Sequence, residues 1–392
     1  PAPRIAGIIE KTDPRIVIVG RESAPELPDT SANVLAIEQL PETSSDGQDA
    51  NPDTDLRSVD LCYVIFTSGT SGEPNGVMVT HGNLEGLFGN IRDSLGFSSR
   101  DRWLAMHSLA FGFSAWEIWG ALSHGATLVI APEAMRRDPA AWTALADAGE
   151  VSVLSLTPSA LRQLLLLDPV PVDGLRRHGR LIALSGEAVE ETDIAQWFAA
   201  VGDSGPRLVN TYALTETAGR VALLEYAAKD SRHADSIGVA TPDAELFVVD
   251  SDRNAIADQG ELFVAGPMVA AGYWGDRQLT AERFVEFDPG DGRLRYCYRT
   301  GDQVRRLPGG ELAFRGRLDA QVKLRGYRVE LSDIEQVLRR HPAVADAAAV
   351  IGESATGSTA LTAFVVPEAG TSQTLEFWPS LGEHLLYDEL LY

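Results

Sequence analysis

Apolar and polar positions change their spacing along the chain, and these changes mark its elements. Between about residues 61 and 221, short apolar runs alternate with helical patterns. The runs predict the strands Leu61–Phe66, Ala126–Ile130, Val151–Leu156, Arg180–Leu184 and Arg207–Thr211. The patterns between them predict helices, among them Ser159–Leu167 and Glu191–Ala200. Such alternation is typical of a mainly parallel α/β sheet.

The pattern changes twice more toward the C-terminus. From about Ile237 to Arg317 the predicted strands lie closer together, with Gly and Pro turns, which indicates a smaller β-rich unit. After Leu318 a new α/β pattern begins. Its predicted elements are a strand at Gln321–Leu324, a helix at Leu331–Arg340, and strands at Ala345–Ile351 and Ala360–Val366.

We therefore expect an α/β protein with two domains and a boundary near Asp319. The large N-terminal domain, residues 1–318, combines parallel α/β sheets with the small β-rich subdomain. A smaller α+β C-terminal subdomain begins in residues 319–367, and residues 368–392 form a tail. Residues 22–60 are rich in Asp, Ser, Pro and Glu, and we expect them to form an exposed acidic connection.

Composition narrows the classes of function. The chain has 392 residues, with 33 Lys and Arg against 56 Asp and Glu, and its formal net charge is −23. This excess of acid argues against nucleic acid or an anionic membrane as a partner. The two cysteines, Cys62 and Cys297, form no disulfide framework or zinc-binding spacing, so a reducing cytoplasm is the default location. No apolar run has the length of a transmembrane helix.

The loop from Thr67 to Gly76, directly after the apolar run that ends at Phe66, is the first candidate for chemistry. Its glycines let backbone N–H groups approach phosphate oxygens, and its hydroxyl groups add further donors. It is not a Walker loop, because no Gly-Lys-Ser/Thr sequence follows. A turn rich in Ser, Thr and Gly is also common as a plain surface loop, so the loop alone leaves both interpretations open.

Further motifs follow this loop in a fixed order. They are Phe111–Trp119, Ser185–Ala188, Asn210–Glu216, Gly260–Leu262, Ala271–Tyr273, Tyr298–Asp302 and Gly316–Glu330. The ordered series resembles the core motifs of the adenylate-forming superfamily, and most closely the adenylation domains of nonribosomal peptide synthetases. The resemblance covers roughly residues 3–366, and it favours phosphate binding by the Thr67–Gly76 loop.

The resemblance implies ATP and Mg²⁺ as cofactors. A carboxylate oxygen would attack the α-phosphorus of ATP while pyrophosphate leaves on Mg²⁺. Glu216 would hold the Mg²⁺, Thr215 would contact the α-phosphate, and Lys323 is a further catalytic position. Tyr212 would stack on adenine, and Asp302 would accept both ribose hydroxyls. The positions implied around ATP or AMP are Thr67, Ser68, Gly69, Thr70, Ser71, Gly72, Gly76, Gly186, Glu187, Asn210, Tyr212, Asp302 and Arg317.

The same resemblance implies a pocket for the acid substrate. Its positions are Phe111, Gly112, Phe113, Trp116, Ser155, Ala183, Ser185, Thr211, Gly219 and Arg220. Phe113 and Trp116 would form an apolar wall. The hydroxyl groups of Ser155, Ser185 and Thr211 could recognise a hydroxyl, carbonyl or amide of the substrate. Arg220 would either pair with a second acidic group or turn outward.

Gly112 departs from the family pattern. Amino-acid-activating relatives carry at this position an Asp that pairs with the α-ammonium group of the substrate. A buried ammonium without a counter-charge is costly, so we expect an acid without an α-amino group. Aryl, hydroxy, keto and fatty-type acids fit, as does an acid with its amine elsewhere.

Other departures concern the loop and the two ends. Asn75 replaces the usual lysine of the phosphate loop, so we expect weaker ATP handling with the same ligand. The opening motifs of the family are absent, and no lysine follows Lys323 to serve as the adenylation lysine. We therefore expect a large domain without its first part, an incomplete small domain, and poor adenylation by this chain alone. The tail is dense in aromatic and acidic residues, which is typical of a packed terminal helix or of the lead-in to an inserted methyltransferase.

The function that follows is activation of a carboxylic acid as acyl-AMP for the phosphopantetheine thiol of a carrier domain. Asp319 would be the hinge about which the small domain rotates between the two half-reactions. Condensation or polyketide synthase domains in the same polypeptide, and an MbtH-like protein, are the other partners that the resemblance implies. The alternatives are a freestanding acyl- or aryl-CoA synthetase and, in another class, a non-catalytic nucleotide-binding remnant or docking module.

Overall fold

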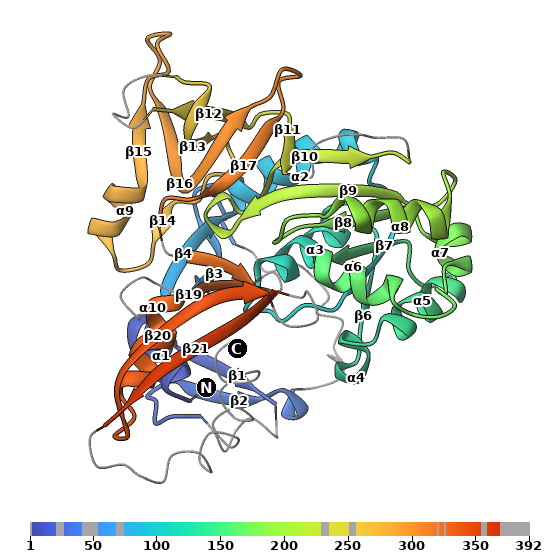
Figure 1. Cartoon of the computed structure of the whole chain (residues 1–392). Coiled ribbons are helices and arrows are strands. Elements are labelled where there is room, and N and C mark those ends of the chain that lie inside the picture. The colour runs from blue at the N-terminus through green and yellow to red at the C-terminus, as the bar shows by residue number, and fades with distance from the viewer. Residues whose placement is uncertain are drawn as a thin grey trace.

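The computed structural model describes residues 2–20, 27–40, 54–67, 74–228, 235–250, 256–319, 321–324, 327–353 and 359–368. The largest sheet among them has 12 strands (Figure 1). From one edge to the other they are β12 (Glu245–Val249), β13 (Gln259–Ala265), β16 (Arg295–Arg306), β17 (Leu312–Arg317), β11 (Ser236–Ala240), β10 (Gly219–Tyr226), β9 (Arg207–Leu214), β8 (Leu181–Leu184), β7 (Val153–Leu156), β5 (Arg102–Ala105) and β6 (Thr127–Ile130), with β15 (Phe284–Phe287) paired to β16.

The half of this sheet from β6 to β9 confirms the predicted parallel α/β pattern. The helices on one face are α2 (His81–Leu95) and α3 (Gly112–Ser123), and those on the other are α5 (Pro139–Asp147), α6 (Pro158–Leu165), α7 (Asp173–His178) and α8 (Glu191–Val201), with the short α4 (Glu133–Arg136) before α5. Val153 packs into the core on the side of α2 and α3, whereas its neighbour Leu154 packs with the other helices. Both faces of β7 and β8 are buried, and this is why these strands appear in the sequence as continuous apolar runs.

Local sequence signals fix where the helices begin and end. Thr80 caps α2 in a capping box with Asn83, and Gly96 ends the helix with φ of 66°, a left-handed conformation that favours glycine. Thr157 caps α6 through its side chain, and Pro158 occupies the first turn, where its missing N–H group costs nothing.

The strand predicted at Leu61–Phe66 exists but belongs to another sheet. β3 (Leu61–Thr67) pairs antiparallel with β4 (Asn75–Thr80), and β14 (Gly272–Tyr273) completes a three-stranded sheet. Its placement in the parallel sheet was therefore a wrong expectation. A parallel neighbour requires a crossover of about a dozen residues, and the short connection from β3 to β4 permits only a hairpin.

The β-rich segment forms the antiparallel half of the large sheet. β10 pairs antiparallel with β9, so the predicted β-rich unit continues the parallel half, and α9 (Arg277–Arg283) lies between β14 and β15. Beyond residue 319 the predicted elements are confirmed as β18 (Gln321–Leu324), α10 (Leu331–Arg339), β20 (Val344–Glu353) and β21 (Thr359–Pro367). A further strand that was not predicted, β19 (Tyr327–Glu330), pairs with β18, and residues of β19, α10, β20 and β21 form a small core of their own.

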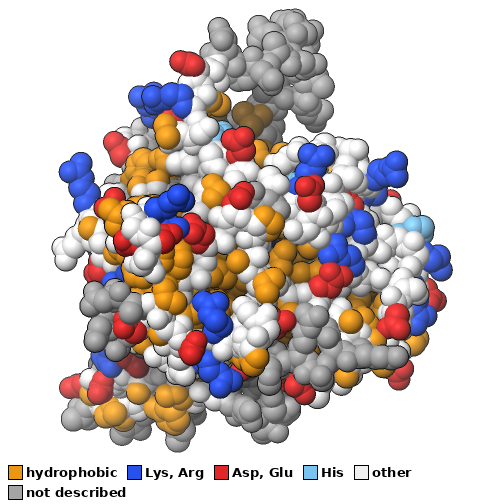
Figure 2. All heavy atoms as spheres, turned by 90° about the horizontal axis from the view of Figure 1, so that it is seen from above, with side chains coloured by type: hydrophobic (Ala, Val, Ile, Leu, Met, Phe, Trp, Pro, Cys, Tyr) orange, Lys and Arg blue, Asp and Glu red, His pale blue; other side chains and the backbone are white. Residues whose placement is uncertain are grey.

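The N-terminal segment contains α1 (Ala2–Thr12) and a parallel pair of strands, β1 (Ile16–Val19) and β2 (Asn33–Ala36), followed by the 3-10 turn η2 (Ile37–Gln39). The exposed acidic connection expected over 22–60 thus contains the strand β2, which the sequence did not predict because its apolar run has only 4 residues. None of the described helices combines the length and the apolar character needed to cross a membrane. Basic and acidic side chains lie interspersed on the face shown in Figure 2.

Two helical glycines provide a test of this packing. A Cβ atom at Gly120 in α3 would lie 2.5 Å from the Trp103 ring, whereas a Cβ atom at Gly89 in α2 would meet nothing within 4 Å. We expect Gly120→Ala to lower the free energy of unfolding by about 1–3 kcal/mol through overpacking. Gly89→Ala should raise it by about 0.5–1 kcal/mol, because alanine favours the helix. Urea unfolding of the two variants measures both effects, and a stabilising Gly120→Ala would contradict the packing.

Candidate active site

The predicted site residues gather where the parallel strands end. Ser155 lies on β7, Ser185 follows β8, and Thr215 follows β9 in the 3-10 turn η3 (Thr215–Thr217). The carboxyl ends of parallel strands meet at one edge of a sheet, which is where α/β proteins bind ligands. The sheet pairing places Ser155 opposite Ala183 and Leu184 opposite Asn210 at this edge.

Asp302 joins this edge to the antiparallel half of the sheet. It lies on β16, is fully buried, and binds the Tyr212 hydroxyl group and the Arg317 guanidinium. Arg317 also binds both oxygens of Asp319, at 2.6 and 2.8 Å. Burial first, and then the charge of Asp302, raises the pKa of Tyr212 well above its usual range, so Tyr212 remains a neutral donor.

The predicted adenine and ribose positions therefore form one connected group. A carboxylate offers about four acceptor positions, so Asp302 keeps capacity for a ribose hydroxyl beside the two hydrogen bonds that it already accepts. The predicted roles of Tyr212, Asp302 and Arg317 stay predictions, and the structure adds that the three side chains hold one another in place.

Glu216 is buried on η3, and its Oε1 accepts a 2.9 Å hydrogen bond from the Tyr273 hydroxyl group. Thr215, beside it, is half-buried. Within the described ranges, no cluster of three or more His, Cys, Asp or Glu residues could hold a metal ion. Mg²⁺ usually takes one or two carboxylates and completes its shell with water and phosphate oxygens, so Glu216 fits an ion that binds together with a nucleotide.

Much of the predicted phosphate loop, namely Ser68, Gly69, Thr70, Ser71 and Gly72, lies outside the described residues. Its ends are described: Thr67 pairs with Asn75 across the β3–β4 hairpin, and Gly76 follows on β4. The hairpin thus brings the two ends of the loop together, as a loop that encloses a phosphate requires.

Two basic residues of α1 bind the base of this loop, and sequence reasoning missed both. Lys11 donates to the carbonyl of Pro74 and Arg4 to the carbonyl of Phe66, each at 3.0 Å. These contacts join residues 63 and 62 positions apart, and no local pattern marks them.

Gly186, Glu187 and Asn210 lie at the ends of β8 and β9. Gly186 has φ of 92°, which requires glycine. The Glu187 carboxylate accepts a 2.9 Å hydrogen bond from the backbone N–H of Ser159 and so serves the start of α6. Asn210 is buried on β9.

The Arg220 side chain turns inward, so the alternative in which it turns outward does not hold. It is 2% exposed, and its guanidinium carbon lies 3.7 Å from the centre of the Trp116 ring and 5.0 Å from that of Phe113. Phe113 and Trp116 are themselves buried, and a cation lies against their rings. Burial lowers the pKa of Arg220 well below its usual range, and the nearby Glu117 and Tyr63 oppose this shift.

Two of the three predicted hydroxyl contacts are used within the protein. Ser185 Oγ donates to the carbonyl of Thr211 at 2.7 Å, and Thr211 Oγ1 donates to the carbonyl of Leu184 at 2.8 Å. Ser155 Oγ is buried and has no hydrogen-bond partner among the described residues. The hydroxyl donor that remains for a ligand is therefore that of Ser155.

The small pocket positions differ in the space around them, because a Cβ atom at Gly219 would lie 2.9 Å from Leu87 Cδ2. Gly112 is the first residue of α3, and a Cβ atom there would meet only Thr215 Oγ1, at 3.6 Å, so the position accepts a side chain. Gly219 has φ of 146° at the start of β10, and Ala183 is buried on β8. Phe111 precedes α3, and its ring centre lies 5.2 Å from that of Phe113.

The buried Glu117 and the half-buried His107 form a pair that sequence reasoning did not assign. Glu117 Oε1 lies 2.7 Å from His107 Nδ1, and its Oε2 accepts from the backbone N–H groups of Met106 and His107 at 3.2 and 3.3 Å. The His107 ring stacks on Phe113 with ring centres 4.5 Å apart. The pair therefore braces the side chain of Phe113 through the stacked His107 ring. The sequence signal for this pair would have been Glu117 itself, an acidic residue among the apolar residues of α3.

The predicted hinge and Lys323 lie at the start of the C-terminal elements. Asp319 is held by Arg317 and lies 3.7 Å from Arg283 Nη2, so the hinge position is tied to the large sheet in this conformation. Lys323 is on β18, paired with Arg328 on β19.

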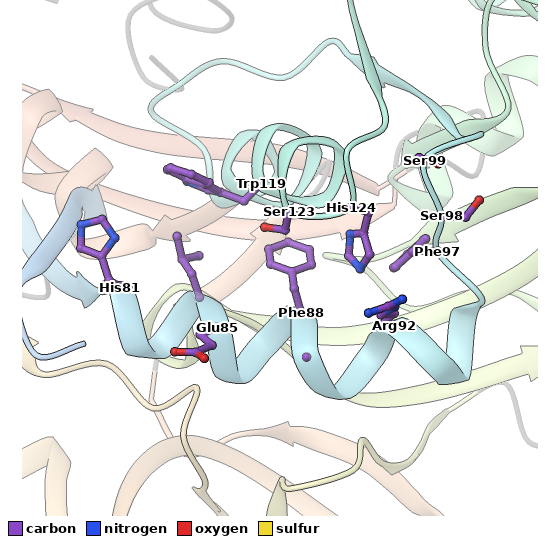
Figure 3. A pocket seen from close by; sticks show the side chains of 12 residues that line it. His81, Glu85, Phe88, Arg92, Phe97, Ser98, Ser99, Trp119, Ser123 and His124 are labelled. Carbon is purple, nitrogen blue, oxygen red and sulfur yellow. The ribbon is translucent and has the colours of Figure 1, made fainter. Parts of the chain in front are cut away.

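A cavity of about 640 Å³ lies between α2 and α3, outside the predicted site (Figure 3). Figure 3 shows His81, Phe88 and Arg92 along α2, across from Trp119 on α3 and from His124, which directly follows α3. None of the predicted site residues lines it. Phe88 stacks on Trp116 at 5.4 Å, so this cavity lies on the far side of an aromatic layer.

Comparison with family models gives two matches. A model described as AMP-binding enzyme matches residues 1–274, and one described as AMP-binding enzyme C-terminal domain matches residues 333–385. The second match runs through most of the tail, and the comparisons give no support for an inserted methyltransferase. The boundary near Asp319 stays a prediction.

Known proteins are similar over nearly the whole chain. The chain is 36% identical over 400 residues to the dimodular nonribosomal peptide synthase of Bacillus subtilis, covering 98% of this chain and 17% of that protein. It is 34% identical over 383 residues to syringomycin synthase SyrB1 of Pseudomonas syringae, covering 96% and 61%. Among solved structures, NpsA-ThdA, an artificially fused adenylation–PCP di-domain from Klebsiella oxytoca, has a TM-score of 0.80 and 27% identity, covering 98% and 74%. The chain thus spans less than two thirds of the length of either synthase.

The bracing role of Glu117 can be tested by Glu117→Gln. The amide would turn an N–H donor toward the donors that bind Glu117, and Arg220 would lose its nearby negative charge. We expect the free energy of unfolding to fall by about 3–5 kcal/mol, as for other broken buried charge contacts. The exposed Glu190, 2.9 Å from Arg162, is the matched control. Glu190→Gln should change the free energy of unfolding by about 0.5 kcal/mol or less. Equal effects of the two substitutions in chemical unfolding would contradict this role.

Proposed function

We propose, from the premise that this chain belongs to the AMP-binding enzyme family and is of the nonribosomal peptide synthetase adenylation type, that it activates a carboxylic acid without an α-amino group for a carrier domain. The observation that carries the reaction is the connected group of Tyr212, Asp302 and Arg317, together with the buried Glu216 in the turn that follows β9. The observation that carries the substrate class is Gly112.

Two steps make up the reaction. A carboxylate oxygen of the acid attacks the α-phosphorus of ATP, and the bond to pyrophosphate breaks, which gives acyl-AMP. The phosphopantetheine thiol of a carrier then attacks the acyl carbon, gives up its proton, and AMP leaves. Mg²⁺, bound with ATP, would neutralise charge on the leaving pyrophosphate.

The chain's own residues would bind and orient these reactants. The Tyr212 ring and the Asp302 carboxylate would hold the nucleoside, and Arg317 would steady Asp302. Thr215 would donate to the α-phosphate, and Glu216 would supply the carboxylate for Mg²⁺. Lys323, and Asp319 as a hinge, would act when the small domain turns.

Pyrophosphate exchange in the full-length protein, over a panel of acids with and without an α-amino group, tests the reaction. We expect exchange with at least one acid of the second kind. Glu216→Gln should lower kcat/KM for ATP at least about tenfold, which corresponds to the loss of one charge-assisted contact. Glu225→Gln, which removes the exposed partner of Arg207, should leave it unchanged.

The outcomes of this assay separate the alternatives. Exchange followed by transfer to free CoA would favour an acyl-CoA synthetase, and absence of both exchange and ATP binding would favour a non-catalytic remnant. The 392-residue chain assayed alone should exchange slowly, because no lysine follows Lys323. A rate equal to that of the full-length protein would contradict this expectation.

Gly112→Asp tests the substrate class. The position accepts the Cβ atom of an aspartate, because the nearest atom to a Cβ there is 3.6 Å away. It should raise kcat/KM for an α-amino acid relative to its deaminated analogue by about tenfold or more, since a buried ammonium gains a partner. Gly112→Asn, of equal size and without charge, is the control. A wild-type protein that already prefers α-amino acids would contradict the proposal.

A further inference from the structure

Arg220 is buried with part of its hydrogen-bonding capacity unused. Its side chain lies against Trp116, and both Nε and Nη2 are buried without a hydrogen-bond partner among the described residues. An arginine stays charged in proteins, and a buried charge is normally paired and hydrogen-bonded. Two unsatisfied donors on one buried guanidinium therefore point to a partner from outside the chain.

The two unsatisfied atoms are those with which an arginine binds a carboxylate side-on. Four other arginines of this chain use the same pair of atoms. They are Arg162 on Asp193, Arg180 on Asp101, Arg207 on Glu225 and Arg317 on Asp319. The nitrogen–oxygen distances in these pairs run from 2.6 to 3.1 Å. The geometry that Arg220 offers is thus the one that this protein fills with carboxylates elsewhere.

Glu117, the acidic residue near Arg220, does not accept hydrogen bonds from its Nε or Nη2. Both Glu117 oxygens are bound to His107 and to the backbone N–H groups of Met106 and His107. Its charge favours the charged form of Arg220 through space, while Nε and Nη2 of Arg220 remain without an acceptor.

Two other positions of the predicted acid pocket also favour an anionic ligand. Ser155 Oγ is a second buried polar atom without a partner among the described residues. Gly112 supplies no negative charge at the position where relatives carry Asp. The pocket therefore combines a cation with a free hydroxyl group, and this set suits a substrate that carries anionic oxygens.

We propose that Arg220 determines specificity by binding a second carboxylate of the substrate through Nε and Nη2, so that the activated acid is a dicarboxylic acid. This inference rests on the proposed adenylating function and adds its substrate class. One carboxylate reacts at the α-phosphorus, and the other lies against Arg220 beside Trp116. A cationic side chain on the substrate would meet a like charge there.

Pyrophosphate exchange in the full-length protein with matched acids tests the inference. The acids are succinate, glutarate and adipate, their monomethyl esters, and butyrate, pentanoate and hexanoate, with aspartate and glutamate as the α-amino counterparts. We expect kcat/KM for the best dicarboxylate to exceed that for its monomethyl ester by at least about 100-fold, because the ester leaves a buried charge unpaired.

Arg220→Met should remove this preference. Methionine is apolar and of similar reach, and replacing a buried charge in this way usually keeps the fold. Arg207→Met, which removes an arginine paired with Glu225 at the surface, is the matched control and should keep the preference. If Arg220→Met fails to fold, the comparison of diacid with ester in the wild-type protein decides alone.

Three results would overturn the inference. A best substrate with a single carboxylate, whether a monocarboxylate, a monoester or an α-amino acid other than aspartate or glutamate, contradicts it and leaves the adenylating function intact. A preference for dicarboxylates that persists in a folded Arg220→Met protein removes the role of Arg220. Absence of exchange with every acid, α-amino acids included, removes the proposed function and this inference with it.

Discussion

The buried carboxylate of Asp302 is the contact on which the arrangement of the site depends. It binds Tyr212 on β9 and Arg317 on β17, so one side chain joins the parallel half of the sheet to its antiparallel half. Arg317 extends this connection to Asp319, where the C-terminal elements begin. A buried carboxylate is costly without partners, so the three groups fix one another before any nucleotide binds. The proposed nucleotide site is thus part of the joint between the two halves of the sheet.

The proposed acid pocket shows the opposite condition, because its buried charge is incompletely paired. Arg220 is stabilised by the Trp116 ring and by the charge of Glu117, yet two of its donors bind nothing in the described chain. Such unsatisfied groups lower the stability of a free protein and are typical of sites that wait for a ligand. The contrast between Asp302 and Arg220 separates a contact that maintains the fold from one that selects a substrate.

The sequence was sufficient for the elements whose pattern is local. The strands β7, β8 and β9 were predicted because both of their faces are buried, and the ordered motifs located the sheet edge where Ser155, Ser185 and Thr215 lie. The sequence did not predict which distant segments pair with one another. Three features depend on partners that only the fold brings close. They are the β3–β4 hairpin, the hydrogen bond from Lys11 to the base of the loop, and the hydrogen bond from the Thr211 hydroxyl group to Leu184. Arg220 had two open alternatives for the same reason, since only packing decides whether a long side chain turns inward.

The most direct test of this account is the unfolding temperature of the wild-type and Arg220→Met proteins, each with and without the dicarboxylate that supports exchange. The account predicts that the ligand-free variant is as stable as the wild type or more stable, because an incompletely paired buried charge is gone. It also predicts that the dicarboxylate raises the unfolding temperature of the wild type alone. A variant that is strongly destabilised without ligand, or an equal shift in both proteins, would show that Arg220 serves the fold and does not bind the substrate.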